Sequence, residues 1–176
     1  MLSQVKSGMM LIDQERALER IYYEKYFKEL HQNKGASQQL LFPKTVRLSP
    51  VEYQISLEIL DLLRDVGFVI EDFGQQTYVI NGIPVSFGNE DEEVLLKSIL
   101  EQYTINDNLA PKDKKERFSK TLAKRNASRM KKNLSAEEIK SMMKQLFETS
   151  MPAISPNGLP VLKILGLKEI AQLLIS

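Results

Sequence analysis

Residues 15–30 carry the feature that most constrains the fold, a helical pattern whose apolar surface is too wide for one packing partner. Five apolar residues recur at helical spacing: Leu18, Ile21, Tyr22, Tyr26 and Leu30. Tyr23 and Phe27 widen this stripe beyond one face of the helix. Because a helix with so wide an apolar surface must bury it on more than one side, we expect other elements to cover two of its sides.

Residues 40–67 predict a strand followed by a helix with clear ends. Residues 40–48 read as a strand, and Ser49-Pro50-Val51-Glu52 follows as a capping box with proline at the first helical position. The apolar residues of this helix fall on one face: Ile55, Ile59, Leu62, Leu63 and Val66. Gly67 is placed to adopt the left-handed conformation that ends a helix.

A hairpin is expected next, formed by residues 68–73 and 77–80. Three residues that begin with Gly74 join these strands, so we expect this glycine in the turn. The dipeptide Asn81-Gly82 predicts another turn. Pro84 follows in a strand-like run, and because proline cannot donate to a sheet ladder, we expect that run at a sheet edge.

Three more helices are expected after these strands. Asn89 and the four acidic residues after it predict a capped helix that runs to about Tyr103. After a linker at residues 106–111, the basic segment 112–132 reads as a helix. A second capping box, Ser135-Ala136-Glu137-Glu138, opens the third helix. We expect its buried side to consist of Met142, Met143, Leu146 and Phe147.

Short strands are expected near both ends of the sequence. Residues 9–12 are a short apolar run, and we expect the residues before them to belong to the same strand. After a loop at residues 150–160 that is dense in proline and glycine, residues 161–165 predict a final strand. A closing helix is expected from about Leu167. The mixture of strands and helices predicts an α/β or α+β fold.

Composition excludes several kinds of chemistry. The chain has no cysteine, which excludes disulfides and thiolate metal sites. The single histidine, His31, has no nucleophile or second base at a suitable spacing, and no glycine-rich phosphate loop occurs. No apolar run approaches the roughly 20 residues of a membrane span, and the first residues do not resemble a secretory signal. We therefore expect a cytosolic protein without membrane contact.

Charge is distributed unevenly, although the formal net charge is only +1. Residues 112–132 contain ten lysine and arginine residues against two acidic residues. Such a segment attracts polyanions, and a solvated helix face is the other reading of the same pattern. The residues that we expect to contact a DNA backbone are Lys114, Lys115, Arg117, Lys120, Lys124, Arg125 and Arg129.

Three separate stretches carry the motifs of one protein family. Residues 13–24 are similar to the pattern Asp-Gln-His-Ala-x-x-Glu-Arg-Ile-x-x-Glu. The block of residues 40–84 has the family's strand, Leu-Ser-Pro helix, Gly-Phe, hairpin and closing Ile-Pro. Ser155-Pro156-Asn157-Gly158-Leu159-Pro160 aligns with Cys-Pro-His-Gly-Arg-Pro. Together these stretches span nearly the whole chain, which resembles the C-terminal region of the MutL family of DNA mismatch repair proteins.

The resemblance implies a dimerisation domain with two subdomains. Residues 1–36 and 131–176 are expected to form the dimerisation subdomain, and residues 37–130 the inserted external subdomain. Leu18, Ile21 and Tyr22 are the expected homodimer contacts. The resemblance also places an ATPase in an N-terminal region outside this sequence, and it implies contact with a MutS-type mismatch sensor through the full-length protein. No cofactor is expected in this chain.

The motifs of the DNA-nicking members are degenerate in this sequence. In those members the first motif and two later ones are thought to bind the metal ions of a phosphodiester-cleaving site. Here Glu15 stands in place of the first motif's histidine, and Lys124 in place of a cysteine. Ser155 and Asn157 replace the cysteine and histidine of the last motif. Because neutral oxygen ligands are weak for transition metals and a lysine repels cations, we expect no metal site, no catalytic residue and no nicking activity.

The alternative is a divergent nicking endonuclease with a carboxylate-only site. Four carboxylates remain near the first motif, and oxygen ligands suit magnesium or manganese: Asp13, Glu15, Glu19 and Glu24. The same charges could instead cap and solubilise a helix.

Residues 38–43 match a linear docking pattern, Gln-x-x-Leu-x-Pro. The resemblance to the MutL family implies that this pattern binds the replicative sliding clamp. An amide would fix one end, apolar side chains would fill a pocket, and proline would hold the backbone extended. The expected contacts are Gln38, Leu41, Phe42 and Pro43. The other reading is an ordinary strand with Leu41 in the core.

Overall fold

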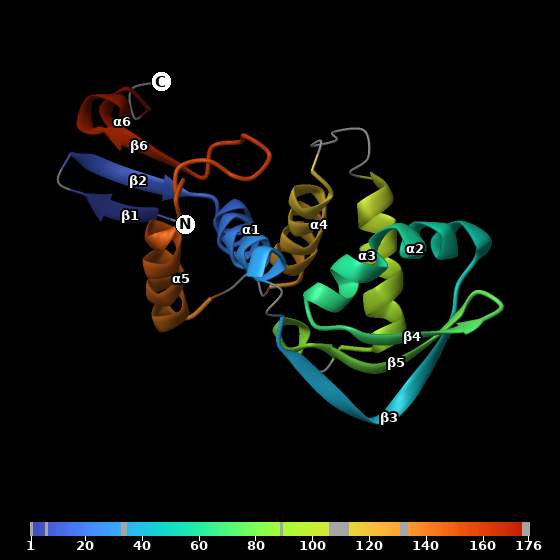
Figure 1. Ribbon diagram of the computed structural model, residues 1–176. Coiled ribbons are helices and arrows are strands. Elements are labelled where there is room, and N and C mark those ends of the chain that lie inside the picture. The colour runs from blue at the N-terminus through green and yellow to red at the C-terminus, as the bar shows by residue number, and fades with distance from the viewer. Residues whose placement is uncertain are drawn as a thin grey trace.

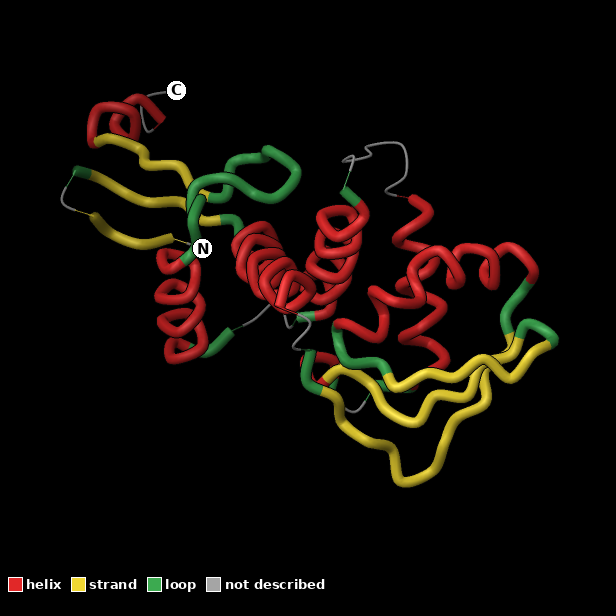
Figure 2. The backbone as a smooth tube through the Cα atoms, viewed as in Figure 1, coloured by secondary structure: helices red, strands yellow, loops and turns green. Residues whose placement is uncertain are grey.

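The computed structural model describes residues 2–5, 7–32, 35–88, 90–105, 113–130 and 134–173. These residues form a mixed α/β fold with two three-stranded antiparallel sheets, in the orders β1-β2-β6 and β3-β5-β4. The sheets lie in two lobes at opposite ends of the molecule, with helices α1 and α4 between them (Figures 1 and 2). The expected fold class is confirmed.

Helix α1 (Gln14–Gln32) is buried on two sides, as its wide apolar stripe predicts. Tyr26 and Leu30 belong to the larger core, and Leu18 belongs to the smaller one. Helix α4 (Lys114–Arg129) packs along α1 and also contributes to both cores. A buried polar contact joins the two helices, in which the Asn126 amide donates to the Tyr26 hydroxyl over 2.6 Å.

The smaller lobe contains strands β1 (Leu2–Val5), β2 (Gly8–Ile12) and β6 (Leu162–Gly166) with helices α5 (Ala136–Glu148) and α6 (Leu167–Leu173). One correction concerns β1, which is not part of the strand at residues 9–12 but its hairpin partner. Val5 pairs with Gly8, where φ is +151° and a Cβ would lie 2.0 Å from the Leu165 carbonyl oxygen. A second correction concerns Phe147, which is 51% exposed.

The larger lobe packs two helices on one face of the sheet β3-β5-β4 (Figure 1). Its elements are β3 (Ser37–Arg47), α2 (Pro50–Asp65), β4 (Val69–Gly74), β5 (Thr77–Pro84), the short 3-10 helix η1 (Val85–Phe87) and α3 (Glu92–Ile105). Both predicted capping boxes are present, at the starts of α2 and α5. Gly67 has φ +110°, as expected after α2.

The sheet departs from prediction at three places. The β4–β5 turn consists of Gln75 and Gln76, with φ of 49° and 59°, and Gly74 stands just before them. Asn81-Gly82 makes no turn, because it lies inside β5. The registers of both neighbouring strands shift there, which is the signature of a bulge. Pro84 ends the central strand, and this end position, rather than a sheet edge, accommodates the missing N–H.

Some expectations fall outside the described residues. These are the cap at Asn89 and the linker at residues 106–111. Within the described chain, the Asp91 carboxylate accepts from the Val94 N–H over 3.0 Å at the start of α3. No helix in the described ranges has the length and apolarity that a membrane crossing requires. The proposed subdomain boundaries stay a prediction, and α4 contributes apolar residues to both cores.

Candidate functional site

The loop at residues 150–160 is held against one side of α1 by polar side chains. Arg16 donates to the Pro160 carbonyl over 3.0 Å, and Arg20 donates to the Ile154 carbonyl over 2.7 Å. The Asn157 amide donates to the Glu19 carboxylate over 2.8 Å. One helical turn further on, the Ser150 N–H and hydroxyl donate to Glu24 over 2.9 and 2.6 Å. We call these four contacts the loop latch.

The fold of the loop places Asn157 at its tip. The Ser155 N–H donates to the Leu159 carbonyl over 2.7 Å, and the Ser155 hydroxyl accepts from the Leu159 N–H. Gly158 closes this turn with φ +80°. Ser155 is therefore buried in the turn that it stabilises, and only Asn157 reaches α1 among the residues that replace the last motif's ligands.

The structure brings residues from all three degenerate motifs to one place. Glu19 comes from α1, Lys124 from α4, and Asn157 from the loop. Burial raises the pKa of the Glu19 carboxyl above its usual range, and the positive charge of nearby Lys124 opposes that shift. Glu19 is only 8% exposed, so its hydrogen bond to Asn157 compensates a largely desolvated group.

These residues do not fit a metal ion. The Asn157 amide donates an N–H to Glu19, so a carboxylate oxygen that a cation would need is already engaged. Glu24 is engaged by Ser150, and Asp13 caps α1 by accepting from the Arg16 N–H over 3.1 Å. Across the described ranges, no three histidine, aspartate or glutamate side chains gather closely enough to hold a metal ion.

Helix α4 uses many of its basic side chains for contacts within the chain. Arg125 is 6% exposed and pairs with Glu90, which Arg129 also contacts. Arg117 stacks over Tyr103 with its guanidinium carbon 3.8 Å from the ring centroid. The remaining lysines differ in their partners: Lys115 donates to the Leu30 carbonyl, Lys120 pairs with Glu116, and Lys114 lies 3.6 Å from Glu58.

Exposure separates the basic residues that a phosphate could reach. Lys124 is exposed, Lys114 is 64% exposed, and Arg129 is 44% exposed. Lys112, Lys131 and Lys132 lie outside the described residues.

Sequence reasoning missed Glu90, because it stands among acidic residues that favour a helix start. Only the spatial approach of α4 reveals it as the internal partner of two arginines.

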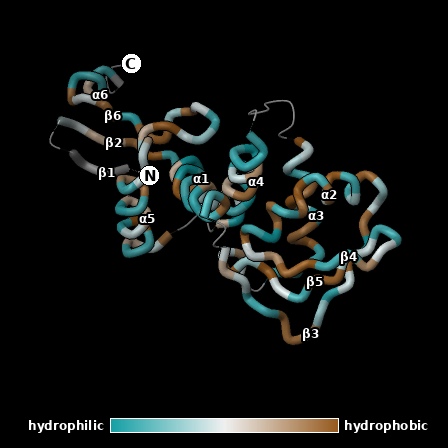
Figure 3. Tube along the Cα trace, in the orientation of Figure 1, coloured by the Kyte–Doolittle hydropathy of each residue, from teal (hydrophilic) through white to brown (hydrophobic). Residues whose placement is uncertain are grey.

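The docking pattern at residues 38–43 projects from strand β3. Gln39 pairs with Gly82 and Lys44 with Ile80, so four residues of β3 stand opposite Asn81 alone. Leu41 is 94% exposed and Phe42 84% exposed, and Figure 1 shows β3 bending away from β5 at this point. The apolar colouring at this bend is visible in Figure 3. The alternative that Leu41 lies in the core is wrong.

The residues expected at the dimer interface belong to α1 and line a cleft between α1 and α5. Ile21 and Tyr22 are partly buried and line a cleft of about 190 Å³ with Met142. Leu18 also lines this cleft but is only 6% exposed.

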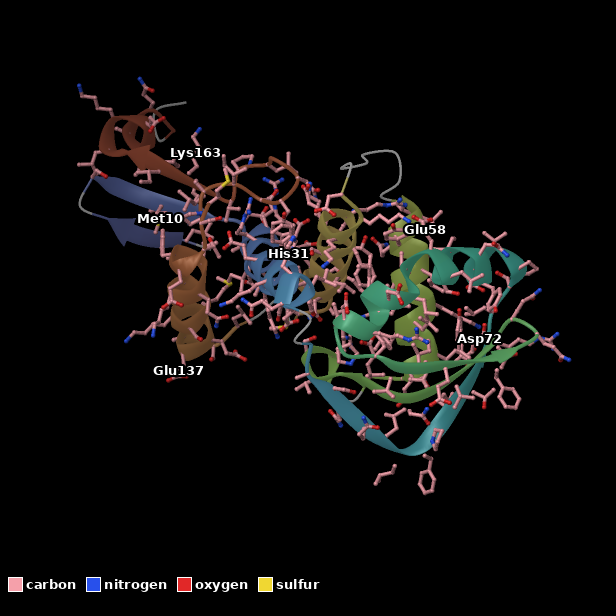
Figure 4. The ribbon with its side chains drawn as sticks, in the orientation of Figure 1. Met10, His31, Glu58, Asp72, Glu137 and Lys163 are labelled. Carbon is pink, nitrogen blue, oxygen red and sulfur yellow. The ribbon has the colours of Figure 1, made fainter. Side chains whose placement is uncertain are left out.

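His31 takes no part in any of these sites. It lies near the end of α1 (Figure 4). Its ring packs at a tilt against Phe27 with centroids 4.1 Å apart, and its Nδ1 contacts the Phe27 carbonyl oxygen.

Comparison with known proteins finds a consistent set of relatives. The family model of the MutL C-terminal dimerisation domain matches residues 1–134. The DNA mismatch repair protein MutL of Prosthecochloris aestuarii is 37% identical over 97% of this chain and 27% of its own length. Those of Chlorobium phaeobacteroides and Chlorobium limicola are each 36% identical over 98% of this chain. The chain thus spans about a quarter of the length of these relatives.

The loop latch predicts a measurable contribution of Asn157 to stability. In Asn157→Ala the buried Glu19 carboxylate loses its amide donor, and we expect the free energy of unfolding to fall by about 1–3 kcal/mol. Lys144→Ala is the control, because it removes an ion pair with Glu148 in which both side chains are exposed. Its effect should stay within about 0.5 kcal/mol in urea denaturation. Equal stability of the two variants would contradict the latch.

Proposed function

Because this chain belongs to the MutL family of DNA mismatch repair proteins and carries its C-terminal dimerisation domain, we propose that it is a homodimerisation scaffold. Two copies would join the N-terminal parts of two full-length proteins, which would include the ATPase and contact a MutS-type mismatch sensor. The proposal includes a cytosolic location and no cofactor in this chain. The single observation that carries it is the match to the dimerisation domain over residues 1–134.

The proposed dimer contact includes the cleft between α1 and α5. Ile21 and Tyr22 line this cleft, and the buried Leu18 lines it as well. Partly exposed apolar side chains beside a cleft are suited to receive apolar side chains from a second copy.

Docking to the sliding clamp is proposed for Gln38, Leu41, Phe42 and Pro43. The support is the exposure of Leu41 and Phe42 in a segment that projects from the sheet. Exposed apolar anchors on an extended backbone suit recognition by an apolar pocket.

Contact with DNA phosphates is proposed for the exposed basic residues of α4, with Lys124, Arg129 and Lys114 as the main ones. Lys115, Arg117 and Lys120 are secondary because they are only partly exposed. Arg125 is set aside, since it is buried against Glu90. Such contact is independent of base sequence.

Loss of the nicking site is part of the same proposal. The support is the amide donor on Glu19 and the lysine beside it, at the positions where the resemblance implies metal ligands. We favour this proposal over a carboxylate-only endonuclease, because Asp13 and Glu24 are engaged in other contacts within the chain.

The dimer predicts a specific response to Ile21 variants. The wild-type chain should sediment as a dimer at micromolar concentration, and Ile21→Glu should shift it to monomer because it places a charge in an apolar contact. Ile21→Ala should give a weaker shift. Leu57→Glu is the control, since Leu57 is 44% exposed on α2. A monomeric wild type would refute the dimer, and dimeric Ile21 variants would refute this interface.

Clamp docking predicts that two exposed apolar residues dominate the affinity. Leu41→Ala and Phe42→Ala should each weaken binding to a purified bacterial sliding clamp by about 30-fold, the equivalent of about 2 kcal/mol. Gln38→Ala should weaken it less. Phe73→Ala is the matched control, because Phe73 is 76% exposed on the opposite edge strand. Equal affinity of all four variants and the wild type would remove the docking proposal.

DNA contact without cleavage predicts two readouts on one supercoiled plasmid. Binding should weaken as salt rises, and Lys124→Ala or Arg129→Ala should each reduce the slope of log affinity against log salt by about 1. Lys140→Ala on the exposed side of α5 should leave the slope unchanged. With manganese the plasmid should stay supercoiled. Nicking that disappears in Asp13→Asn would establish the endonuclease alternative instead.

A further inference from the structure

Strand β3 pairs with β5 on both sides of residues 40–43, which we call the docking segment. Before the segment, Ser37, Gln38 and Gln39 pair with residues 82–84 of β5. After it, Lys44 to Arg47 pair with residues 77–80. Within the segment, Leu40 packs against the larger core while Leu41 and Phe42 stay exposed. The segment is therefore a loop with two fixed ends and an anchored first residue.

The second attachment is fixed by packing and charge. Val46 is fully buried in the larger core. Lys44 lies 3.8 Å from the Asp91 carboxylate. These contacts do not involve the first attachment, which contains Gln38.

The first attachment depends on the absence of a side chain at Gly82. A Cβ there would lie 2.7 Å from the Ser37 hydroxyl oxygen, 3.1 Å from the Gln38 carbonyl oxygen and 3.1 Å from a Val69 methyl carbon. The first distance is shorter than real contacts allow, and the other two are tight. A Cβ at position 82 therefore requires the Ser37 side chain to rotate or shift, and it requires the Gln38 carbonyl to move by a few tenths of an ångström.

We infer that Gly82 is a positioning residue for the docking segment. Gly82 sets where Gln38 lies relative to Leu41 and Phe42. This inference rests on the proposed docking to the sliding clamp. Gln38 supplies the amide of the pattern and the two apolar residues supply its anchors, so their spacing decides whether one pocket can take all three. Gly82 lies outside the Gln-x-x-Leu-x-Pro pattern and acts only through the strand beside it.

Preorganisation is the physical reason for an effect on affinity. A loop whose ends are fixed has lost much of its backbone freedom before binding, so less is lost on association. Displacing Ser37 and Gln38 frees one end and misplaces the amide. The Asn81 bulge makes room for the loop, and Gly82 holds the end of the strand that enters it.

Ser37 offers a way to test this contact from the other side. Its buried hydroxyl has no hydrogen-bond partner among the residues that the structure describes. Ser37→Ala therefore removes the atom that would lie nearest to a Cβ at position 82, without breaking a known hydrogen bond. It should leave clamp affinity within about twofold of wild type.

The experiment measures the affinity of five chains and one peptide for a purified bacterial sliding clamp, and Ser37→Ala is one of the five. Gly82→Ala should bind about tenfold more weakly than wild type, and Gly82→Ala with Ser37→Ala should recover to within about threefold. A free peptide of residues 36–46 should bind more weakly than the wild-type chain. Gly74→Ala is the control, because its φ is +81° and nothing lies near its Cβ, so it strains a turn without touching β3.

The outcomes separate this inference from the proposed function. If neither the wild-type chain nor the peptide binds the clamp, the docking proposal fails. If the wild-type chain binds and Gly82→Ala binds equally well, only the positioning role fails. A loss in Gly82→Ala without rescue by Ser37→Ala, at a melting temperature equal to that of Gly74→Ala, also contradicts the role. Should Gly82→Ala not fold, Ser37→Val crowds the same contact from β3 and should give the same loss.

Discussion

Burial of α1 on two sides is the constraint on which the rest of the structure depends. Tyr26 and Leu30 close the larger core, and Leu18 closes the smaller one, so neither lobe has a complete interior without this helix. Helix α4 shares the arrangement and is joined to α1 by the Asn126–Tyr26 hydrogen bond. Because one rigid element serves both cores, surfaces at opposite ends of the molecule keep a fixed relation to each other.

The polar side of α1 uses residues of the first motif for contacts within the chain. Arg16, Glu19, Arg20 and Glu24 each hold part of the loop at residues 150–160. The loop leads directly into β6, so these contacts help to fix the sheet of the smaller lobe. A carboxylate that is buried must have a partner, and Asn157 supplies one without a cation. Retention of acidic residues in such a motif is therefore no evidence of catalysis.

Local signals were readable from the sequence, and contacts between distant segments were not. Ser49 with Glu52 and Ser135 with Glu138 act within one helical turn, so their capping boxes were predictable. Asn81-Gly82 has a turn signature, yet two neighbouring strands hold it inside β5 as a bulge. Arg125 has the signature of a DNA contact, yet α4 brings it to Glu90, 35 residues away. The three degenerate motifs were identified by resemblance, but only the fold pairs Asn157 with Glu19.

The exposure of Leu41 and Phe42 has an energetic consequence for the isolated chain. Full burial of either side chain would contribute roughly 1.5–3 kcal/mol, and the β3 loop forgoes this stabilisation. If β3 continued in a regular register, Phe42 would face the core side with Leu40 and Val46, because alternate residues of a strand share a face. The register shift opposite Asn81 interrupts this alternation, and Leu41 and Phe42 stay exposed. The sheet is therefore built to keep these apolar side chains outside, where a partner can bury them instead.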